Sequence, residues 1–162
     1  MIDAVLYKRV LGSFPSGVTV VTTFDESGQI TGFTASAFSA VSMAPPLVLI
    51  CPSTGSDSYP HLRRNGHFAI HILHEDQQSI AYAFATKGTN KAAGMDWHLS
   101  KHGNAILEGA VAVMECRLWQ EYDGGDHAIL VAEVLAMSAE EAPPMLYCRG
   151  RMSAMSPLLE QI

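Results

Sequence analysis

Histidines are the first side chains to consider for chemistry, because the 162-residue sequence contains seven of them. His67 and His71 are four residues apart, and His74 follows three residues later. On a helix this spacing places imidazoles over one metal ion, but residues 67–73 have the alternating pattern of a strand, where that clamp does not form. We therefore predict no metal site. We expect instead that the histidines of this strand face solvent or extend their rings toward solvent.

His127 is the other candidate histidine, because it stands between a turn and an apolar run. Residues 122–134 read YDGGDHAILVAEV, so two glycines permit a tight turn just before the imidazole. The side chain could be a metal ligand, a catalytic group or the first residue of a strand, and residue types alone leave these roles open. The sequence shows no GxSxG, no P-loop and no GxGxxG after a strand, the usual hydrolase and nucleotide-binding signatures.

Small and hydroxylated residues are concentrated in residues 31–58, which read TGFTASAFSAVSMAPPLVLICPSTGSDS. Small side chains let a flat ligand approach the backbone, and hydroxyls with the amides of a helix start can bind a phosphate without a lysine cluster. A structural alternative is that the small residues pack a tight barrel and the serines cap a short helix. Composition alone favours this structural alternative.

The elements that position these residues are predicted to be mainly strands. Apolar alternation and β-branched residues predict strands at residues 17–24, 29–41, 47–51, 67–73, 111–122, 127–137 and 145–152. Helical spacing predicts helices at residues 2–11 and 75–86, with a short helix ended by Gly66 between them. Residues 87–109 read as a loop with short extended pieces, a candidate lid. Without βαβ alternation, this order predicts an antiparallel barrel.

The length, net charge and cysteine content of the chain limit the possible functions. The length suits one domain. The net charge of −6, with 10 basic residues scattered along the chain, argues against nucleic acid as the main partner. Three widely spaced cysteines, without CxxC spacing, suggest neither a disulfide frame nor a zinc site and fit a reducing cytoplasm. We expect no signal peptide and no membrane span.

Five segments resemble, in order, those of the short-chain flavin reductase family, whose members have the FMN-binding split-barrel fold. They read FPSGVTVVTT, GFTASAFSAVSMAPPLVLICPS, GHFAIHIL, GGDHAILVAEV and PPMLYCRGR, and they extend from Phe14 to Arg151. The resemblance implies one flavin reductase-like domain over residues 1–162, mainly β, folded as an antiparallel split β-barrel with a few short helices. It also implies a homodimer with each flavin near the subunit boundary.

The resemblance further implies which residues surround the flavin. Backbone groups at four consecutive positions would contact the isoalloxazine ring and ribityl chain: Thr34, Ala35, Ser36 and Ala37. Three residues after the next strand would line the same flavin: Cys51, Pro52 and Ser53. Two hydroxyls and one ammonium group would serve the phosphate: Ser56, Ser58 and Lys91. The aromatic residues that the family has near the Lys91 position and after RGR are missing here, Met152 standing at the second of these positions.

For His127, the resemblance implies a place beside the reactive face of the flavin, where it orients the nicotinamide of NADH or NADPH. Asp126 would support it. Hydride transfer requires close stacking and exclusion of water, while the bond chemistry belongs to the cofactors. His127 is therefore assigned to binding and orientation rather than to proton transfer.

The implied function is that of an NAD(P)H:flavin oxidoreductase, which reduces FMN or FAD and supplies reduced flavin to a partner monooxygenase. One alternative is a non-catalytic flavin-binding module that carries electrons or senses them. Another is a small barrel that binds protein partners and no flavin. A more distant alternative is an enzyme like pyridoxamine-phosphate oxidase, whose basic phosphate cluster is not visible in this sequence.

Overall fold

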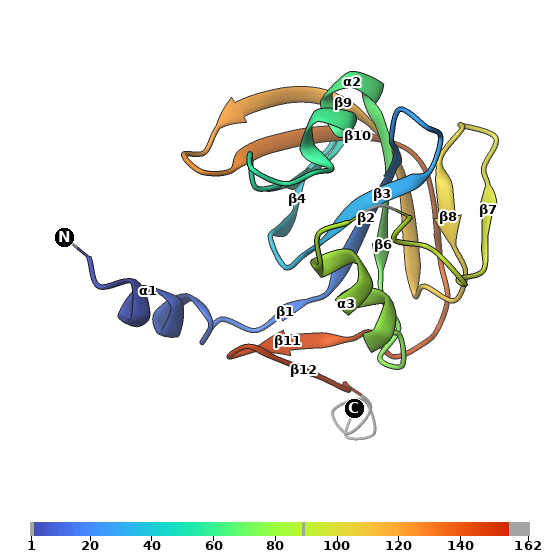
Figure 1. The fold of residues 1–162 in the computed structure, drawn as a ribbon. Helices are drawn as coiled ribbons and strands as arrows, with labels where there is room; N and C mark the ends of the chain where they lie inside the picture. The colour runs from blue at the N-terminus through green and yellow to red at the C-terminus, as the bar shows by residue number, and fades with distance from the viewer. Residues whose placement is uncertain (1, 89, 156–162) are drawn as a thin grey trace.

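A seven-stranded antiparallel sheet forms the centre of the computed structural model, which describes residues 2–88 and 90–155 (Figure 1). The strand order is β3-β2-β6-β9-β10-β5-β4. In chain order these strands are β2 (Thr19–Phe24), β3 (Ile30–Ala35), β4 (Phe38–Met43), β5 (Pro46–Ile50), β6 (His67–Ile72), β9 (Ala112–Asp123) and β10 (Ala128–Ala139). The prediction of a mainly β, antiparallel protein is confirmed.

The two edge strands of this sheet, β3 and β4, follow each other in the chain. Only Ser36 and Ala37 separate them, and we call these two residues the edge connection. Three Cα–Cα steps span at most about 11 Å, so the two edges must approach each other and the sheet must curl. Figure 1 shows this curl, with the two edges meeting below α2 (Tyr59–Asn65).

Apolar side chains pack on both faces of the curled sheet. Val20 and Val21 are neighbours on β2, and because strand side chains alternate they belong to different buried clusters. One cluster joins β2, β5, β6, β9 and β10 and is closed by Leu62 of α2. The other lies under α3 (Gln78–Ala85), where Ala81 and Phe84 are buried. The predicted helix over residues 75–86 is therefore confirmed in its central part.

Short strands complete the fold. β1 (Ser16–Gly17), β11 (Leu146–Cys148) and β12 (Arg151–Ser153) form a three-stranded sheet, and β7 (Trp97–Leu99) pairs with β8 (Ala105–Leu107). Residues 87–109 were predicted to be a loop with short extended pieces, and β7 and β8 are two such pieces. All three residues of β8 are buried. The hydroxyl of Thr22 donates to the carbonyl of Ala105, which fixes this hairpin against β2.

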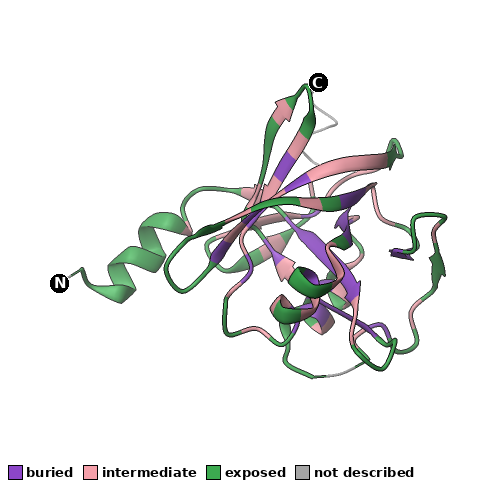
Figure 2. Cartoon of the chain, turned by 90° about the horizontal axis from the view of Figure 1, so that it is seen from above, coloured by how far each residue is buried: buried purple, intermediate pink, exposed green. Residues whose placement is uncertain are grey.

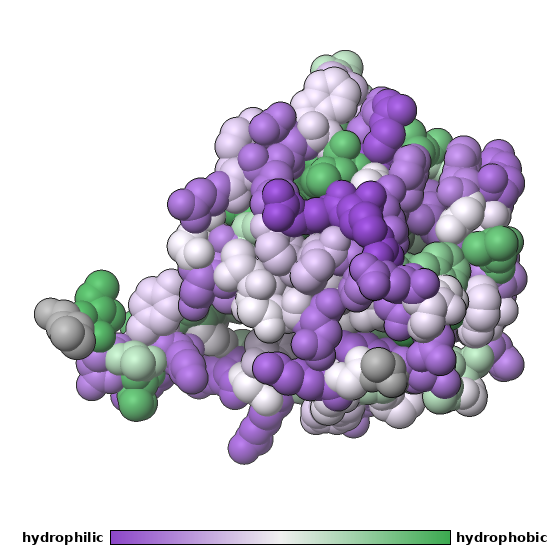
Figure 3. Space-filling view, turned by 45° about the horizontal axis from the view of Figure 1, so that its top comes forward, coloured by the Kyte–Doolittle hydropathy of each residue, from purple (hydrophilic) through white to green (hydrophobic). Residues whose placement is uncertain are grey.

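The N-terminal helix α1 (Ala4–Leu11) confirms the helix predicted at residues 2–11, but it lies outside the buried clusters of the described residues. The carboxylate of Asp3 caps it by accepting from the backbone N–H groups of Val5 and Leu6. No residue of α1 is buried, and the helix projects from the sheet (Figures 1 and 2). Figure 3 shows hydrophobic side chains gathered on this projection.

One sequence expectation about burial is wrong. His71 was expected near solvent but is fully buried: its Nδ1–H donates to Val20 O at 3.1 Å, and its Nε2 accepts from Leu107 N at 3.0 Å. On β9 the carboxylate of Glu115 is also buried, and it accepts from Ser100 and Asn104. On β10, by contrast, Met137 is 77% exposed in the single chain.

No helix in the described residues is long and apolar enough to cross a bilayer.

Candidate functional site

The structure brings the predicted site residues together around the edge connection. β4 and β5 are antiparallel, and Phe38 at the start of β4 pairs with Ile50 at the end of β5. Ser36 and Ala37, just before β4, therefore lie next to Cys51, just after β5. Ser36 and Ala37 are exposed, Cys51 and Ser53 are half-buried and Pro52 is buried. Residues 34–37 and 51–53, which are remote in sequence, therefore form one continuous surface.

His127 joins this surface through backbone pairing. Ser53 and His127 form an isolated antiparallel bridge, and the N–H of Ala128 donates to Pro52 O at 3.0 Å. The N–H of Thr54 also donates to Asp126 O at 3.0 Å. The predicted turn before the strand is confirmed, because the N–H of Gly124 donates to His127 O at 3.0 Å and Gly125 adopts a φ of 84°.

The His127 side chain is oriented by its neighbour. Its Nδ1 lies 2.7 Å from Asp126 Oδ1, and the hydrogen bond with His127 together with its charge lowers the pKa of Asp126 below its usual value. The Asp126 carboxylate is therefore ionised near neutral pH, and Nδ1 carries the hydrogen that it accepts. Nε2 is left to contact a ligand, and 47% of the His127 side chain is exposed.

A cavity of about 440 Å³ opens beside His127. One wall of this cavity is formed by Tyr59 and Arg63 of α2 together with Glu121 of β9. The Glu121 carboxylate accepts hydrogen bonds from the hydroxyl of Tyr59 and, at 2.9 Å, from Arg63 Nε. The Arg63 guanidinium lies over the Tyr59 ring, 5.6 Å from its centroid. The hydrogen bond to Glu121 raises the pKa of Tyr59. These wall residues were not found from the sequence, because Tyr59 and Glu121 are 62 positions apart and belong to no motif.

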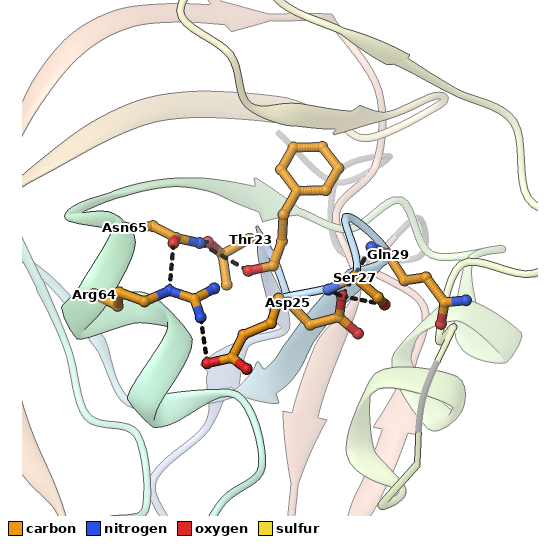
Figure 4. A network of polar contacts seen from close by, with 8 residues as sticks. Thr23, Asp25, Ser27, Gln29, Arg64 and Asn65 are labelled. Carbon is orange, nitrogen blue, oxygen red and sulfur yellow. Dashed lines mark hydrogen bonds and ion pairs between the residues drawn. The ribbon is translucent and has the colours of Figure 1, made fainter.

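Helix α2 is held in place by polar contacts with the β2–β3 hairpin (Figure 4). Asn65 at its end donates through Nδ2 to Thr23 Oγ1 at 2.9 Å and to Phe24 O at 2.7 Å. Asp25 stabilises the hairpin turn by accepting from the N–H groups of Ser27 and Gln29. Gly66 ends the helix at a φ of 64°, as predicted. These contacts fix the α2 wall relative to β3.

A second cavity, of about 320 Å³, lies along the end of β3. Thr34, Ala35 and Ser36 form one side, and aromatic, aliphatic and glycine residues form the rest: Val18, Tyr82, Ala85, Tyr147, Gly150 and Met152. The Thr34 hydroxyl donates to Ala81 O at 2.6 Å, so this side chain anchors α3. Contact between Thr34 and a ligand would therefore use its backbone, as the resemblance implies.

The predicted phosphate residues come from two segments, the residues just before α2 and the loop after α3. Ser58 is buried, and its hydroxyl oxygen lies 3.5 Å from that of Ser56. Ser58 begins α2, but its side chain makes no capping hydrogen bond, contrary to the capping alternative. Partial burial lowers the pKa of Lys91, while the charge of Asp57, between the two serines, acts to raise it. Lys91 therefore lies within electrostatic range of the segment that carries the two hydroxyls.

These residues fit a flavin. Lys91 Nζ donates to Gly32 O at 2.7 Å and to Phe84 O at 3.4 Å, and since an ammonium group has three hydrogens, one remains for a phosphate oxygen. β3 is an edge strand, so alternate backbone N–H and C=O groups on its outer side have no strand partner.

Cys51 is a poor nucleophile, because burial raises the pKa of its thiol. In the described residues no group of His, Cys, Asp and Glu could hold a metal ion.

A third cavity, of about 760 Å³, lies between α1 and the body of the molecule. It shares Ser36, Tyr147 and Gly150 with the second cavity, so the two are contiguous. Sequence reasoning gave no indication of it, because its walls come from both ends of the chain.

The chain is similar to known proteins over most of its length. Residues 11–156 match the family described as "Flavin reductase like domain". The chain is 40% identical over 157 residues to the Rhodococcus jostii flavin-dependent monooxygenase, reductase subunit HsaB, covering 96% of this chain and 80% of that protein. It is 36% identical over 150 residues to the Agrobacterium fabrum FMN reductase (NADH) SmoA, covering 93% and 85%.

A solved structure is similar over nearly its whole length. It is the Streptomyces globisporus NADH:FAD oxidoreductase SgcE6 in complex with NAD and FAD fragments, with a TM-score of 0.90 and 36% sequence identity. The match covers 96% of this chain and 94% of that one.

Proposed function

The chain belongs to the flavin reductase-like domain family, and we propose that it transfers a hydride from NADH to FMN or FAD, giving reduced flavin for a partner monooxygenase. The observation that carries this proposal is the Ser53–His127 bridge, which joins the histidine to the surface formed by residues 34–37 and 51–53. When bound, the flavin accepts the hydride, and the nicotinamide is oxidised. The protein supplies binding, orientation and exclusion of water.

The flavin is proposed to lie along the end of β3. The edge backbone at residues 34–37 contacts the ring and ribityl chain, and Cys51, Pro52 and Ser53 line its other side. The hydroxyls of Ser56 and Ser58 and the remaining Lys91 hydrogen bind the phosphate. Charge-assisted hydrogen bonds to a half-buried ammonium are among the stronger polar contacts, so Lys91 contributes most at this end.

His127 is proposed to orient the nicotinamide. Asp126 accepts from Nδ1, and whenever the imidazole is neutral this leaves the lone pair of Nε2 to the cavity beside it. A nicotinamide carboxamide has an N–H that can donate to this atom. One such contact fixes the ring in its plane over the flavin, as hydride transfer requires.

The cavity beside His127 supports NADH over NADPH as the donor. Glu121 and Asp123 line it, and Arg63, the one cation among the described lining residues, is paired with Glu121. Carboxylates accept hydrogen bonds from ribose hydroxyls and repel a 2′-phosphate. SmoA and SgcE6 are both named for NADH, which agrees with this preference.

The proposal extends to the assembly. Residues 1–162 form one flavin reductase-like domain, the curled sheet is a split barrel open between β3 and β4, and two copies form a homodimer. The support for a dimer is the apolar surface of α1, where Val5, Leu6 and Val10 are 77%, 55% and 59% exposed. A second copy would remove this apolar surface from water. We also assign the protein to the cytoplasm, because its three cysteines are free.

A steady-state assay tests the reaction. NADH and NADPH are each combined with FMN, FAD and riboflavin, and loss of reduced nicotinamide is followed with and without protein. The proposal predicts turnover that depends on added flavin and is faster with NADH. Stoichiometric, tightly bound flavin with negligible turnover would instead show a non-catalytic electron carrier or sensor.

A further inference from the structure

A fourth cavity, of about 180 Å³, is lined by the β7–β8 hairpin and by the ends of β9 and β10. The hairpin contributes His98, Ser100 and Ile106, and the two long strands contribute Glu115 and Ser138 among others. Pockets for drug-sized ligands span roughly 300–1,000 Å³. This cavity therefore suits a single chemical group on a short chain rather than a whole cofactor.

The fourth cavity is far from the residues assigned to the flavin and the nicotinamide. It shares no described lining residue with the other three cavities. At roughly 3.3 Å per residue, Ala136 lies roughly 25 Å along β10 from Ala128, which follows His127. Figure 1 shows β7 and β8 on the side of the molecule opposite α1. A ligand bound here leaves the surface around His127 uncovered.

The carboxylate of Glu115 gives this cavity its chemistry. The residue is only 9% exposed. Ser100 and Asn104 both donate to Oε2, and no group in the described residues donates to Oε1. Every described side-chain oxygen that is closed off from solvent has a hydrogen-bond partner, so Oε1 is accessible. Because Glu115 lines the cavity, a ligand there can reach this oxygen.

This carboxylate also lacks a counter-ion. Glu121 and Glu133 are each paired with an arginine, whereas Glu115 has no ion pair in the described part of the chain. No lysine or arginine is among the described lining residues of the cavity. Buried charges are costly unless they are paired, so the site favours a cationic ligand.

Two further acceptors line the cavity. The Ser138 hydroxyl has no hydrogen-bond partner among the described residues. His98 Nδ1 lies 2.5 Å from Glu108 Oε1, and whenever the imidazole is neutral with Nδ1 donating, Nε2 keeps its lone pair. Together with Glu115 Oε1, these atoms provide one acceptor for each of the three hydrogens of an ammonium group.

The rest of the wall is apolar and favours an organic cation. Ile106, Val113 and Ala136 line the cavity, and a methylene chain packs against such side chains as the stem of a lysine does. A metal ion such as Ca²⁺ takes about six to eight oxygen ligands, more than this cavity offers. A guanidinium fork matches both oxygens of a carboxylate, but here Ser100 and Asn104 already occupy Oε2.

We propose that the fourth cavity binds a primary ammonium group on a short alkyl chain. The ammonium donates to Glu115 Oε1, Ser138 Oγ and His98 Nε2, and the alkyl chain packs on the apolar wall. Such a group is carried both by a lysine side chain of another protein and by a free alkyl amine. The inference goes beyond the proposed reaction and does not depend on it.

The test is a titration of the isotope-labelled full-length chain with n-butylammonium chloride, followed through the NMR signals of the backbone N–H groups. Potassium chloride at equal ionic strength tests for an inorganic cation, and n-butanol tests for the alkyl chain alone. Glu115→Gln removes the charge, and Ser138→Val removes one acceptor at an exposed strand position. Glu140→Gln is the matched control, since it removes an exposed carboxylate just after β10 and outside the cavity.

The proposal predicts saturable changes at Val113, Glu115 and Ala136. The Kd for butylammonium should be about tenfold higher in Glu115→Gln, where a charge-assisted contact is lost, and about threefold higher in Ser138→Val. Glu140→Gln should change this Kd less than twofold. Butanol, which lacks the charge, should bind about tenfold more weakly than butylammonium to the wild type.

Three results would overturn the proposal: equal weakening in Glu115→Gln and Glu140→Gln, equal binding of butanol and butylammonium, or the same signal changes with potassium chloride. If Glu115→Gln does not fold, an unchanged Kd in Ser138→Val overturns it instead. Flavin-dependent NADH oxidation should be unaffected by Ser138→Val, and its absence in the wild type would count against the proposed function alone.

A second ligand, Nα-acetyl-lysine N-methylamide, identifies the source of the ammonium group. Binding as tight as that of butylammonium indicates that the cavity admits a lysine side chain attached to a protein backbone. Binding about tenfold weaker indicates a free alkyl amine, because the backbone is then excluded at the mouth of the cavity.

Discussion

His127 is the residue on which the proposed chemistry depends most closely. Its Nδ1 is held by Asp126 and its backbone by Ser53, so the imidazole lies where the surface formed by residues 34–37 and 51–53 meets the adjacent cavity. The chain also offers His67, an exposed histidine on β6 in no cavity described above, as a comparison.

Replacing His127 with alanine is expected to raise KM for NADH about tenfold and KM for flavin less than twofold, because the lost hydrogen bond orients the nicotinamide. Steady-state kinetics with each substrate varied in turn provide the measurement. His67→Ala should leave both constants unchanged. Equal increases in both KM values for His127→Ala would show that the histidine does not act on the nicotinamide.

Lys91 is expected to distinguish flavins with and without phosphate. Lys91→Met should raise the Kd for FMN about tenfold, since a charge-assisted contact to the phosphate is lost, and leave the Kd for riboflavin nearly unchanged. Quenching of flavin fluorescence on titration measures both. Lys87→Met, at an exposed position nearby in sequence, is the control. An equal loss of FMN and riboflavin affinity would mean that Lys91 only supports the fold through Gly32 and Phe84.

At the scale of elements, the site depends on contacts between strands that sequence patterns do not specify. Hydrophobic alternation predicted most strands of the main sheet, α1 and α3, because each depends on local periodicity. The position of β8 was not predictable, since its burial is set by contacts with Thr22 and His71, which lie far away in sequence. The same applies to the wall made by Tyr59, Arg63 and Glu121.

The roles proposed for His127 and for the residues around the flavin come from the family resemblance, because residue types alone left these roles open. The apolar pattern of α1 predicted a helix but not its exposure, because the pattern does not say whether an apolar face is covered by the same chain.

His71 makes the junction of β2, β6 and β8 sensitive to acid. Burial lowers its pKa from 6.5 to about 4, so the unfolded chain takes up a proton that the folded chain resists. Its contribution to stability is full above pH 6.5 and is lost as the pH falls toward 4. The free energy of unfolding should fall by about 2 kcal/mol between pH 7 and pH 5 from this group.

Urea unfolding at both pH values measures this effect. His71→Gln cannot take up a proton, so it should be less stable at pH 7 but lose about 2 kcal/mol less on acidification than the wild type. The same loss in both proteins would place the acid sensitivity elsewhere.

At the scale of the whole molecule, the proposed dimer rests on the exposed apolar residues of α1. Leu6→Glu places a charge among them and should shift the proposed dimer to monomer, because a buried unpaired carboxylate is costly. Light scattering after size-exclusion chromatography measures the mass. Met137→Glu is the control, because Met137 on β10 is 77% exposed and lies outside α1. A wild-type monomer, or a dimer that survives Leu6→Glu, would contradict this assembly.

The most direct test of the whole account is anaerobic mixing of the protein with NADH and FMN, with both absorbance changes followed together. The account predicts that the bleaching of FMN matches the oxidation of NADH one for one over many turnovers, and that both are much slower with His127→Ala at low NADH. NADH that stays reduced, or FMN that stays oxidised while NADH is consumed, would contradict it.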